Sequence, residues 1–248
     1  MKNIFFSIAI VVFLAGQSLF AKNPIVSPTF DDLVKSIIGG EEYIFDDKNI
    51  IMKVPNFADN PVQVPVYVNA SKIKDAQRMI LFADLNPIPQ IVDMPTTNLL
   101  PIFSSNIKVA QETPLRALVK DSSGIWHVGS ININSNGGGC DISSQASQDS
   151  KFADFLGQTK GQTFEKKNGI TRIKASVFHP METGLIFGNN KFYVKTIVLK
   201  DGNKVIDEIT LTPAISENPR FIFETRTKFK ELNINFLDND ANDFELKL

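Results

Sequence analysis

Short runs of apolar and β-branched residues, separated by polar turns, recur at regular spacing along most of this chain. This pattern is typical of antiparallel β-sandwiches, and no strand–helix alternation of the Rossmann kind accompanies it. Two blocks of such runs predict strands, the first at residues 50–54, 62–69, 79–84, 90–94, 106–111, 115–120 and 126–133, and the second at 171–178, 191–199, 204–211, 220–225, 231–236 and 243–246. The pattern therefore predicts an all-β chain of two consecutive sandwiches.

Helical patterns are confined to two short segments. Residues 28–35 predict a helix, because Ser27 can cap its first turn and the Gly39-Gly40 pair can end it. A second helical stretch is expected at 152–156. Neither segment changes the all-β character of the prediction.

The N-terminus has the pattern of an export signal. Lys2 supplies a positive start, and Ile4–Ala15 is an apolar run of signal-core length that is short for a membrane span. A cut after Ala21 would start the mature chain at Lys22. We expect secretion to the periplasm and no membrane association after signal removal; a retained membrane anchor is the alternative interpretation.

The composition changes between the two blocks of strands. From Asn134 to Gly169 apolar runs are scarce, and Gly, Ser, Gln, Asn, Asp and Lys predominate, as in a flexible linker. We therefore divide the chain into a signal peptide at 1–21, a first sandwich at 22–136, an arm and linker at 137–168, and a second sandwich at 169–248.

Charge excludes one class of partner. The formal net charge is −1 at pH 7, and no run of five or more basic residues occurs. Nucleic-acid binding therefore has no electrostatic support.

Cys140 is the only cysteine of the chain, and it directly follows Gly137, Gly138 and Gly139. Oxidising compartments drive thiols into disulfides, so an exported protein with a single cysteine suggests a use for that thiol. Three glycines have maximal backbone freedom and predict a flexible tether. A linker with an incidental cysteine is the simpler interpretation, and composition alone does not decide between the two.

Other chemistry is poorly supported by the pattern. Cys140, His127 and His179 lack the paired spacing of a zinc site, so we predict no metal. A cysteine nucleophile with His127 or His179 as its base stays an open but weaker hypothesis, because a glycine run gives no rigid support. The segment 179–184, which contains Pro180, predicts a bend between two strands with Met181 packed inward, rather than a catalytic role for His179 or Glu182.

Four motifs resemble known carrier proteins. Asn106–Arg116 and Gly137–Cys140 resemble the SoxY sulfur carrier, and His179–Gly184 and Thr212–Pro219 resemble its partner SoxZ. A SoxY-like half followed by a SoxZ-like half is similar to the SoxYZ-like carrier proteins, some of which are associated with quinoprotein dehydrogenases.

The resemblance implies an immunoglobulin-like β-sandwich for each half, joined by a flexible linker. It implies that Cys140 covalently holds sulfur intermediates of thiosulfate oxidation, on a mobile arm formed by Gly137, Gly138 and Gly139. It also implies a carrier rather than an enzyme, with no catalytic residue and no cofactor. Its partners would be periplasmic sulfur-oxidation enzymes or a quinoprotein dehydrogenase system.

The sequence departs from the family pattern around the cysteine. In SoxY the arm ends the chain, whereas here Asp141 follows and the chain continues, so the thiol would lie on a loop held at both ends. The negative charge of Asp141 disfavours a thiolate unless a cation such as Lys151 or Lys160 compensates. In the second half, Phe187–Lys191 replaces the family's usual segment.

Three functional hypotheses follow. The leading one is a periplasmic carrier that binds a sulfur species through Cys140. The second is a non-enzymatic accessory protein of a periplasmic quinoprotein dehydrogenase, in which the cysteine is incidental. The third is a thiol-dependent transferase or reductase that uses Cys140 with His127 or His179.

Overall fold

The computed structural model describes residues 22–140, 142–144 and 152–248. The expected signal at 1–21 lies outside the described residues, and so do Asp141 and Lys151. In the part of the chain that is described, no helix has the length and apolar character needed to cross a membrane. We call residues 22–140 the first half and residues 152–248 the second half.

Strands account for most of the described elements, so the predicted all-β class is confirmed. The first half contains the helix α1 (Phe30–Ile38) and the strands β1 (Tyr43–Phe45), β2 (Ile51–Lys53), β3 (Val64–Asn69), β4 (Arg78–Ala83), β5 (Gln90–Pro95), β6 (Leu99–Ile107), β7 (Thr113–Lys120) and β8 (Trp126–Ile133). The second half contains the short helices α3 (Phe152–Phe155) and η1 (Lys167–Gly169) and the strands β9 (Thr159–Glu165), β10 (Thr171–Val177), β11 (Val194–Asp201), β12 (Lys204–Leu211), β13 (Arg220–Thr225), β14 (Leu232–Asp238) and β15 (Asp243–Lys247).

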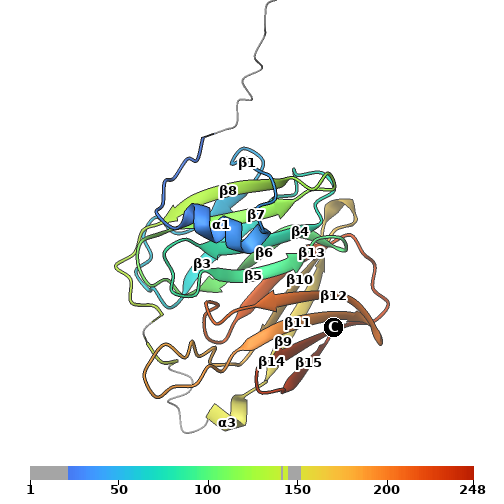
Figure 1. Ribbon diagram of the computed structural model, residues 1–248. Coiled ribbons are helices and arrows are strands. Elements are labelled where there is room, and N and C mark those ends of the chain that lie inside the picture. Colours follow the sequence, from blue (N-terminus) through green and yellow to red (C-terminus); the bar gives the residue numbers. More distant parts are fainter. Residues whose placement is uncertain (1–21, 141, 145–151) are drawn as a thin grey trace, which may run out of the picture.

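These strands form two sheets that face each other across one apolar core (Figure 1). The nine-stranded sheet has the order β1-β8-β7-β4-β5-β12-β11-β14-β15, and the six-stranded sheet has the order β2-β3-β6-β13-β10-β9. Alternating burial along strands such as β3 and β10 places every second side chain in the core between the sheets. The two-layer sandwich architecture predicted from the strand pattern is therefore present.

The two halves are joined edge to edge in both sheets, a feature that the sequence did not predict. In the larger sheet β5 pairs with β12, where Val92 lies opposite Leu211. In the smaller sheet β6 pairs with β13, where Phe103 lies opposite Phe223. A single buried cluster contains apolar side chains of both halves. The halves thus share their sheets and their core, instead of being connected only through a flexible linker.

Three segments differ from the predicted pattern, and one of them is β1, which the sequence did not predict. Residues Thr159–Glu165, expected within the linker, form β9; six of its seven residues are exposed because it lies at the edge of the smaller sheet, so its composition is as polar as that of a linker. Of the strand expected at 106–111, only residues 106 and 107 lie in a strand, at the end of β6, which begins at Leu99. Pro101, which lacks an N–H donor, obscured that start.

The helix α1 covers the outer face of the larger sheet over β4, β7 and β8 (Figure 1). Its buried Phe30, Val34 and Ile38 pack against Phe82 and Trp126 in a second apolar cluster. These three positions are spaced by four residues, which places them on one face of the helix. This cluster closes the first half on the side away from the shared core.

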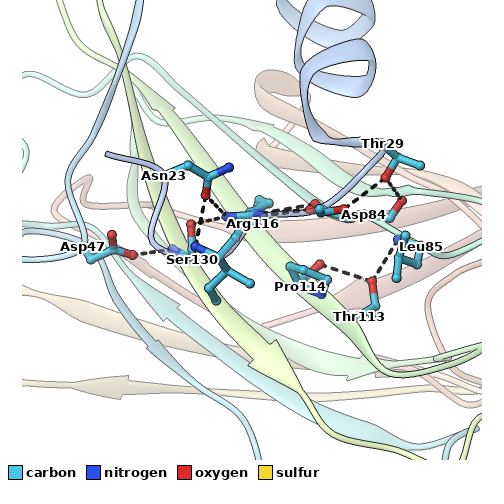
Figure 2. A network of polar contacts seen from close by, with 11 residues as sticks. Asn23, Thr29, Asp47, Asp84, Leu85, Thr113, Pro114, Arg116 and Ser130 are labelled. Atoms are coloured by element: carbon cyan, nitrogen blue, oxygen red, sulfur yellow. Dashed lines mark hydrogen bonds and ion pairs between the residues drawn. The ribbon is translucent and has the colours of Figure 1, made fainter. Parts of the chain in front are cut away.

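A buried ion pair anchors the segment that precedes α1 (Figure 2). The guanidinium of Arg116 lies 2.9 Å from the carboxylate of Asp84, and both side chains are fully buried. Arg116 also donates to the side chains of Ser130 and Asn23, and its guanidinium lies 4.6 Å from the ring centroid of Phe30. This network fixes the loop that begins at Asp84, directly after β4, and that loop supports the site described next.

Candidate thiol site between the two halves

Cys140 lies at the end of a docked segment, which we call the thiol arm (residues 137–140). After β8 the chain turns back, and the N–H groups of Gly138 and Gly139 donate to the carbonyls of Ala110 and Val109, each at 2.9 Å. The side chain of Cys140 is fully buried, with an exposed fraction of 0 %. The structure therefore shows the thiol docked against the protein, and the mobility expected of the glycine arm stays a prediction.

Close backbone approach explains two of the three glycines. A Cβ at Gly137 would lie 2.3 Å from the carbonyl oxygen of Ala110, and one at Gly139 would lie 2.1 Å from that of Pro61. Gly137 and Gly138 also have positive φ angles, 80° and 85°, which side-chain-bearing residues rarely adopt. A Cβ at Gly138 would meet open space. Gly137 and Gly139 therefore let the thiol arm pack directly against the backbone at Ala110 and Pro61.

The backbone under the thiol arm is held by Asn86. Its side-chain amide donates to the carbonyl of Lys108 at 2.8 Å, and its Oδ1 accepts from the N–H of Ala110 at 3.0 Å. Asn86 lies two residues beyond Asp84, the carboxylate bound by Arg116. The buried ion pair and the platform for the thiol arm therefore belong to one connected part of the first half.

Lys108 is a buried cation beside the thiol. Its side chain is 4 % exposed, and its ammonium donates to the carbonyls of Met181 and Pro213 in the second half. Burial lowers the pKa of Lys108 to about 8, and electrostatic interactions with Cys140, Glu182 and Glu217 oppose that decrease. Lys108 thus comes from the first half, is held by the second, and interacts electrostatically with the cysteine.

The second half closes over the thiol arm with polar contacts. The hydroxyl of Thr183 donates to the carbonyl of Cys140 at 3.3 Å. Just beyond the cysteine, the N–H of Ser144 donates to the Glu182 carboxylate at 2.9 Å, and its hydroxyl donates to Glu217. The cysteine is consequently enclosed by residues of both halves.

A cavity of about 190 Å³ adjoins this cluster. It is lined by residues of both halves and of the segment after the thiol arm, namely Asn60, Pro61, Val62, Lys108, Ile142, Ser143, Ser144 and Glu217. One water molecule takes up about 30 Å³ in the liquid, so the cavity has room for several waters or for a small inorganic ion. The buried Lys108 ammonium is part of its wall.

His179 is close to this cluster, but its ring serves packing. It is fully buried and lies 4.4 Å from the ring of Phe192, centroid to centroid. Its Nδ1 accepts from the N–H of Met181 at 3.1 Å, and its Nε2 lies 3.6 Å from the Asp238 carboxylate. Because Nδ1 is already used, that nitrogen is not available as a base for Cys140. Met181 is fully buried, as the predicted bend with Met181 packed inward requires.

The other candidates named from the sequence lie elsewhere. The ring of His127 forms hydrogen bonds with the carboxylates of Asp46, just after β1, and Asp121, in the turn between β7 and β8. The strand β8 runs six residues from His127 to Ile133 before the chain turns toward the thiol arm, a distance of about 20 Å. Lys160 lies exposed on β9. The structure therefore brings neither His127 nor Lys160 to the cysteine.

Sequence reasoning missed Lys108, Glu182 and Glu217 as neighbours of the thiol. Lys108 and Glu217 each lie within a motif that carries the family resemblance, and Glu182 lies within 179–184. Membership of these motifs was the available signal for the three residues. Their spacing along the chain could not reveal that the motifs meet around Cys140. Within the described residues, no group of three or more His, Cys, Asp or Glu side chains is arranged to hold a metal ion.

Comparison with known families explains this convergence. The family model of the sulfur oxidation protein SoxY matches residues 34–140, and that of the sulphur oxidation protein SoxZ matches residues 160–248. The chain is a SoxYZ-like fusion. Cys140 is the last residue of the SoxY match, and the contacts that enclose it come from the SoxY-like and the SoxZ-like half of the fusion.

One solved structure similar to the SoxYZ-like fusion is that of the sulfur carrier protein SoxY from Chlorobium limicola f thiosulfatophilum. It is 23 % identical, with a TM-score of 0.38, and the match covers 43 % of this chain and 96 % of that chain. The comparison with curated proteins gives no match. The two family matches support a carrier function in sulfur oxidation.

Proposed function

We propose that the SoxYZ-like fusion is a periplasmic carrier that holds sulfur intermediates covalently on Cys140 and presents them to partner enzymes. The observation that carries the proposal is the setting of the only cysteine in the chain. It ends the SoxY match, follows three glycines, and is enclosed by both halves next to a buried cation. A cysteine with only a packing role needs none of these features.

The thiol arm must open for Cys140 to reach another protein. The contacts that hold it include the hydrogen bonds of Gly138 and Gly139 to the first half and that of Thr183 to Cys140. Each is worth about 0.5–1.5 kcal/mol, so that breaking all three costs roughly 2–4 kcal/mol. A difference of this size leaves an open state populated at about 0.1–10 %. The docked arm would therefore protect the thiol and still release it.

The chemistry asked of Cys140 is the formation and cleavage of sulfur–sulfur bonds. In an exchange reaction the Cys140 thiolate attacks a sulfur–sulfur bond, the new bond forms, and the leaving sulfur takes the electron pair of the broken bond. Attachment of thiosulfate itself releases the thiol proton and two electrons, which a redox partner enzyme must accept. The carrier supplies the nucleophile, and its partners in sulfur oxidation supply the oxidation and the hydrolysis.

Intact mass spectrometry of the protein from the periplasm of thiosulfate-fed cells tests the proposal. We expect a mass increase that a reductant removes and that a Cys140→Ser variant lacks. Thermal unfolding of the variant, compared with wild type, checks that the substitution leaves the fold in place. Wild-type protein that carries the unmodified mass under these conditions would refute the sulfur-carrier function.

The burial of Cys140 favours a second candidate, in which the thiol only packs between the halves. The protein would then be a non-enzymatic accessory protein, and a periplasmic quinoprotein dehydrogenase is the partner that the sequence resemblance suggests. Affinity capture of partners with wild type and with Cys140→Ser separates the two candidates. Equal capture of a dehydrogenase, together with unchanged dehydrogenase activity in cells, supports the accessory role.

A further inference from the structure

We infer that Lys108 is a positioning residue for Cys140, because its ammonium holds the docked thiol as a thiolate when the two halves are assembled. The inference deepens the proposed function and rests on it for the identity of the nucleophile. The evidence is the burial of Lys108, its contacts with the second half, and the charges that surround it.

The position of the ammonium depends on both halves. The backbone of Lys108 is fixed from the first half by Asn86, and its own N–H donates to the carbonyl of Ala214 at 2.7 Å. Its side chain reaches into the second half and donates to the carbonyls of Met181 and Pro213. Carbonyl oxygens stabilise the ammonium without neutralising its charge, so that the charge remains available to an anion nearby.

The Cys140 thiol, two carboxylates and one histidine face Lys108, and the arm that carries Cys140 docks on Val109, the residue next to Lys108. Electrostatic interactions with Cys140, Glu182 and Glu217 each favour the protonated form of Lys108. His179 is repelled by Lys108, and burial has already lowered the pKa of His179 to about 4. An electrostatic interaction is mutual, so the stabilisation that a Cys140 thiolate gives to the ammonium is returned to the thiolate.

The two carboxylates oppose the thiolate, but each is engaged by a hydrogen-bond donor. Ser144 donates its N–H to Glu182 and its hydroxyl to Glu217. These bonds offset part of the repulsion that the carboxylates exert on an anionic Cys140. Formation of the thiolate releases the thiol proton to water. The inference therefore predicts opposite effects for removal of the cation and removal of a carboxylate charge.

The test measures the ultraviolet absorbance of the Cys140 thiolate between pH 5 and pH 8 in the full-length mature protein, with Cys140→Ser as the baseline. This absorbance needs no reagent to reach the buried sulfur, so its amplitude follows the thiolate population of the docked arm. We expect Lys108→Met to lower the thiolate population at pH 7 by about tenfold or more and to move the profile to higher pH. Lys108→Arg, which keeps the charge, should restore the wild-type profile.

Two further variants keep the test decisive. Glu217→Gln removes an opposing charge and can still accept from Ser144, so it should raise the thiolate population below pH 7. Lys160→Met, at the exposed cation on β9, should leave the profile unchanged. A wild-type profile in a folded Lys108→Met variant overturns the inference. If Lys108→Met does not fold, an unchanged profile in Glu217→Gln overturns it instead.

The assay also separates this inference from the proposed function. The thiolate absorbance reports on Cys140 directly and involves no sulfur cargo. Loss of the periplasmic mass increase with an intact Lys108 effect would refute the sulfur carrier and leave the role of Lys108 standing. A mass increase without any effect of Lys108→Met would refute the role of Lys108 and leave the sulfur-carrier function standing.

Discussion

The imidazole of His179 shows how burial of one side chain makes the stability of the molecule depend on pH. The ring is fully buried and packs on Phe192, and desolvation lowers its pKa from 6.5 to about 4 although Asp238 pulls in the opposite direction. Between these two values the unfolded chain binds a proton that the folded chain does not. The free energy of unfolding therefore decreases as the pH falls from about 6.5 to about 4.

We predict that a His179→Asn variant loses less stability over this range than wild type. The shift of the His179 pKa corresponds to up to about 3 kcal/mol, and Asn keeps an oxygen that can accept from the N–H of Met181. Urea unfolding of both proteins at pH 7, 6, 5 and 4 measures the difference, in which carboxylates common to both proteins cancel. Parallel losses in the two proteins would show that His179 does not carry the effect.

Among the elements, the thiol arm is the one whose role changed most between sequence and structure. The glycine run predicted freedom, and the structure adds a packing reason for it. The backbone of Gly139 passes so close to Pro61 that a Cβ would lie 2.1 Å from its carbonyl oxygen, whereas a Cβ at Gly138 has open space. Periodicity and composition describe one segment of the chain at a time, so they cannot reveal which distant backbone packs against it.

We predict that Gly139→Ala releases the thiol arm. Overlap with the backbone at Pro61 costs about 1–3 kcal/mol, which shifts the equilibrium toward the open arm by roughly tenfold. A bulky maleimide, whose rate is limited by access to Cys140, should therefore react roughly tenfold faster than with wild type. Gly138→Asn is the control, since its Cβ meets open space and Asn is among the residues that adopt a positive φ most readily.

The outcome for the control decides how the acceleration is interpreted. A faster reaction in Gly139→Ala than in Gly138→Asn supports docking through close backbone approach. Equal rates in the two variants would mean that the close approach of Gly139 to Pro61 does not govern the thiol arm, and the packing explanation would fail.

Strand prediction succeeded where apolar residues recur and failed for the edge strands β1 and β9, whereas the edge strands β2 and β15 were predicted. The strands β3, β7 and β12 were recognised because buried residues recur in them. The edge strand β9 was assigned to the linker because six of its seven residues are exposed. Hydrophobic periodicity reports burial, so a strand with one free edge and little burial leaves hardly any signal.

For the whole molecule, the order of motifs predicted two sandwiches but not the strand pairing between them. We call this pairing, of β5 with β12 and of β6 with β13, the seam. Nothing in the pattern of β6 or β13 marks them as partners, because edge pairing is made by backbone groups that every residue carries. The same limit applies to the thiol site. Lys108 and Cys140 were both within recognised motifs, yet their meeting depends on where the second half lies against the first.

The shared sheets predict that the two halves stay together after the chain between them is cut. Both sheets continue across the seam, and Phe103 of the first half packs on Phe223 and Phe221 of the second, with ring centroids 6.1 and 6.3 Å apart. We expect the full chain, with a specific protease site inserted between residues 145 and 151 and cleaved after folding, to elute as one species in size-exclusion chromatography.

A pair of core variants shows whether the seam is what holds the cut protein together. Phe103→Ala removes the aromatic contact across the seam, whereas Phe82→Ala removes an equally buried ring that packs on Phe30 within the first half. Both substitutions should cost about 3–5 kcal/mol of folding stability. Only Phe103→Ala should make the cut halves separate on dilution, because only that ring lies between them. Separation of the cut wild-type halves, or equal separation in both variants, would mean that covalent linkage, and not the continuous sheets, keeps Lys108 beside Cys140.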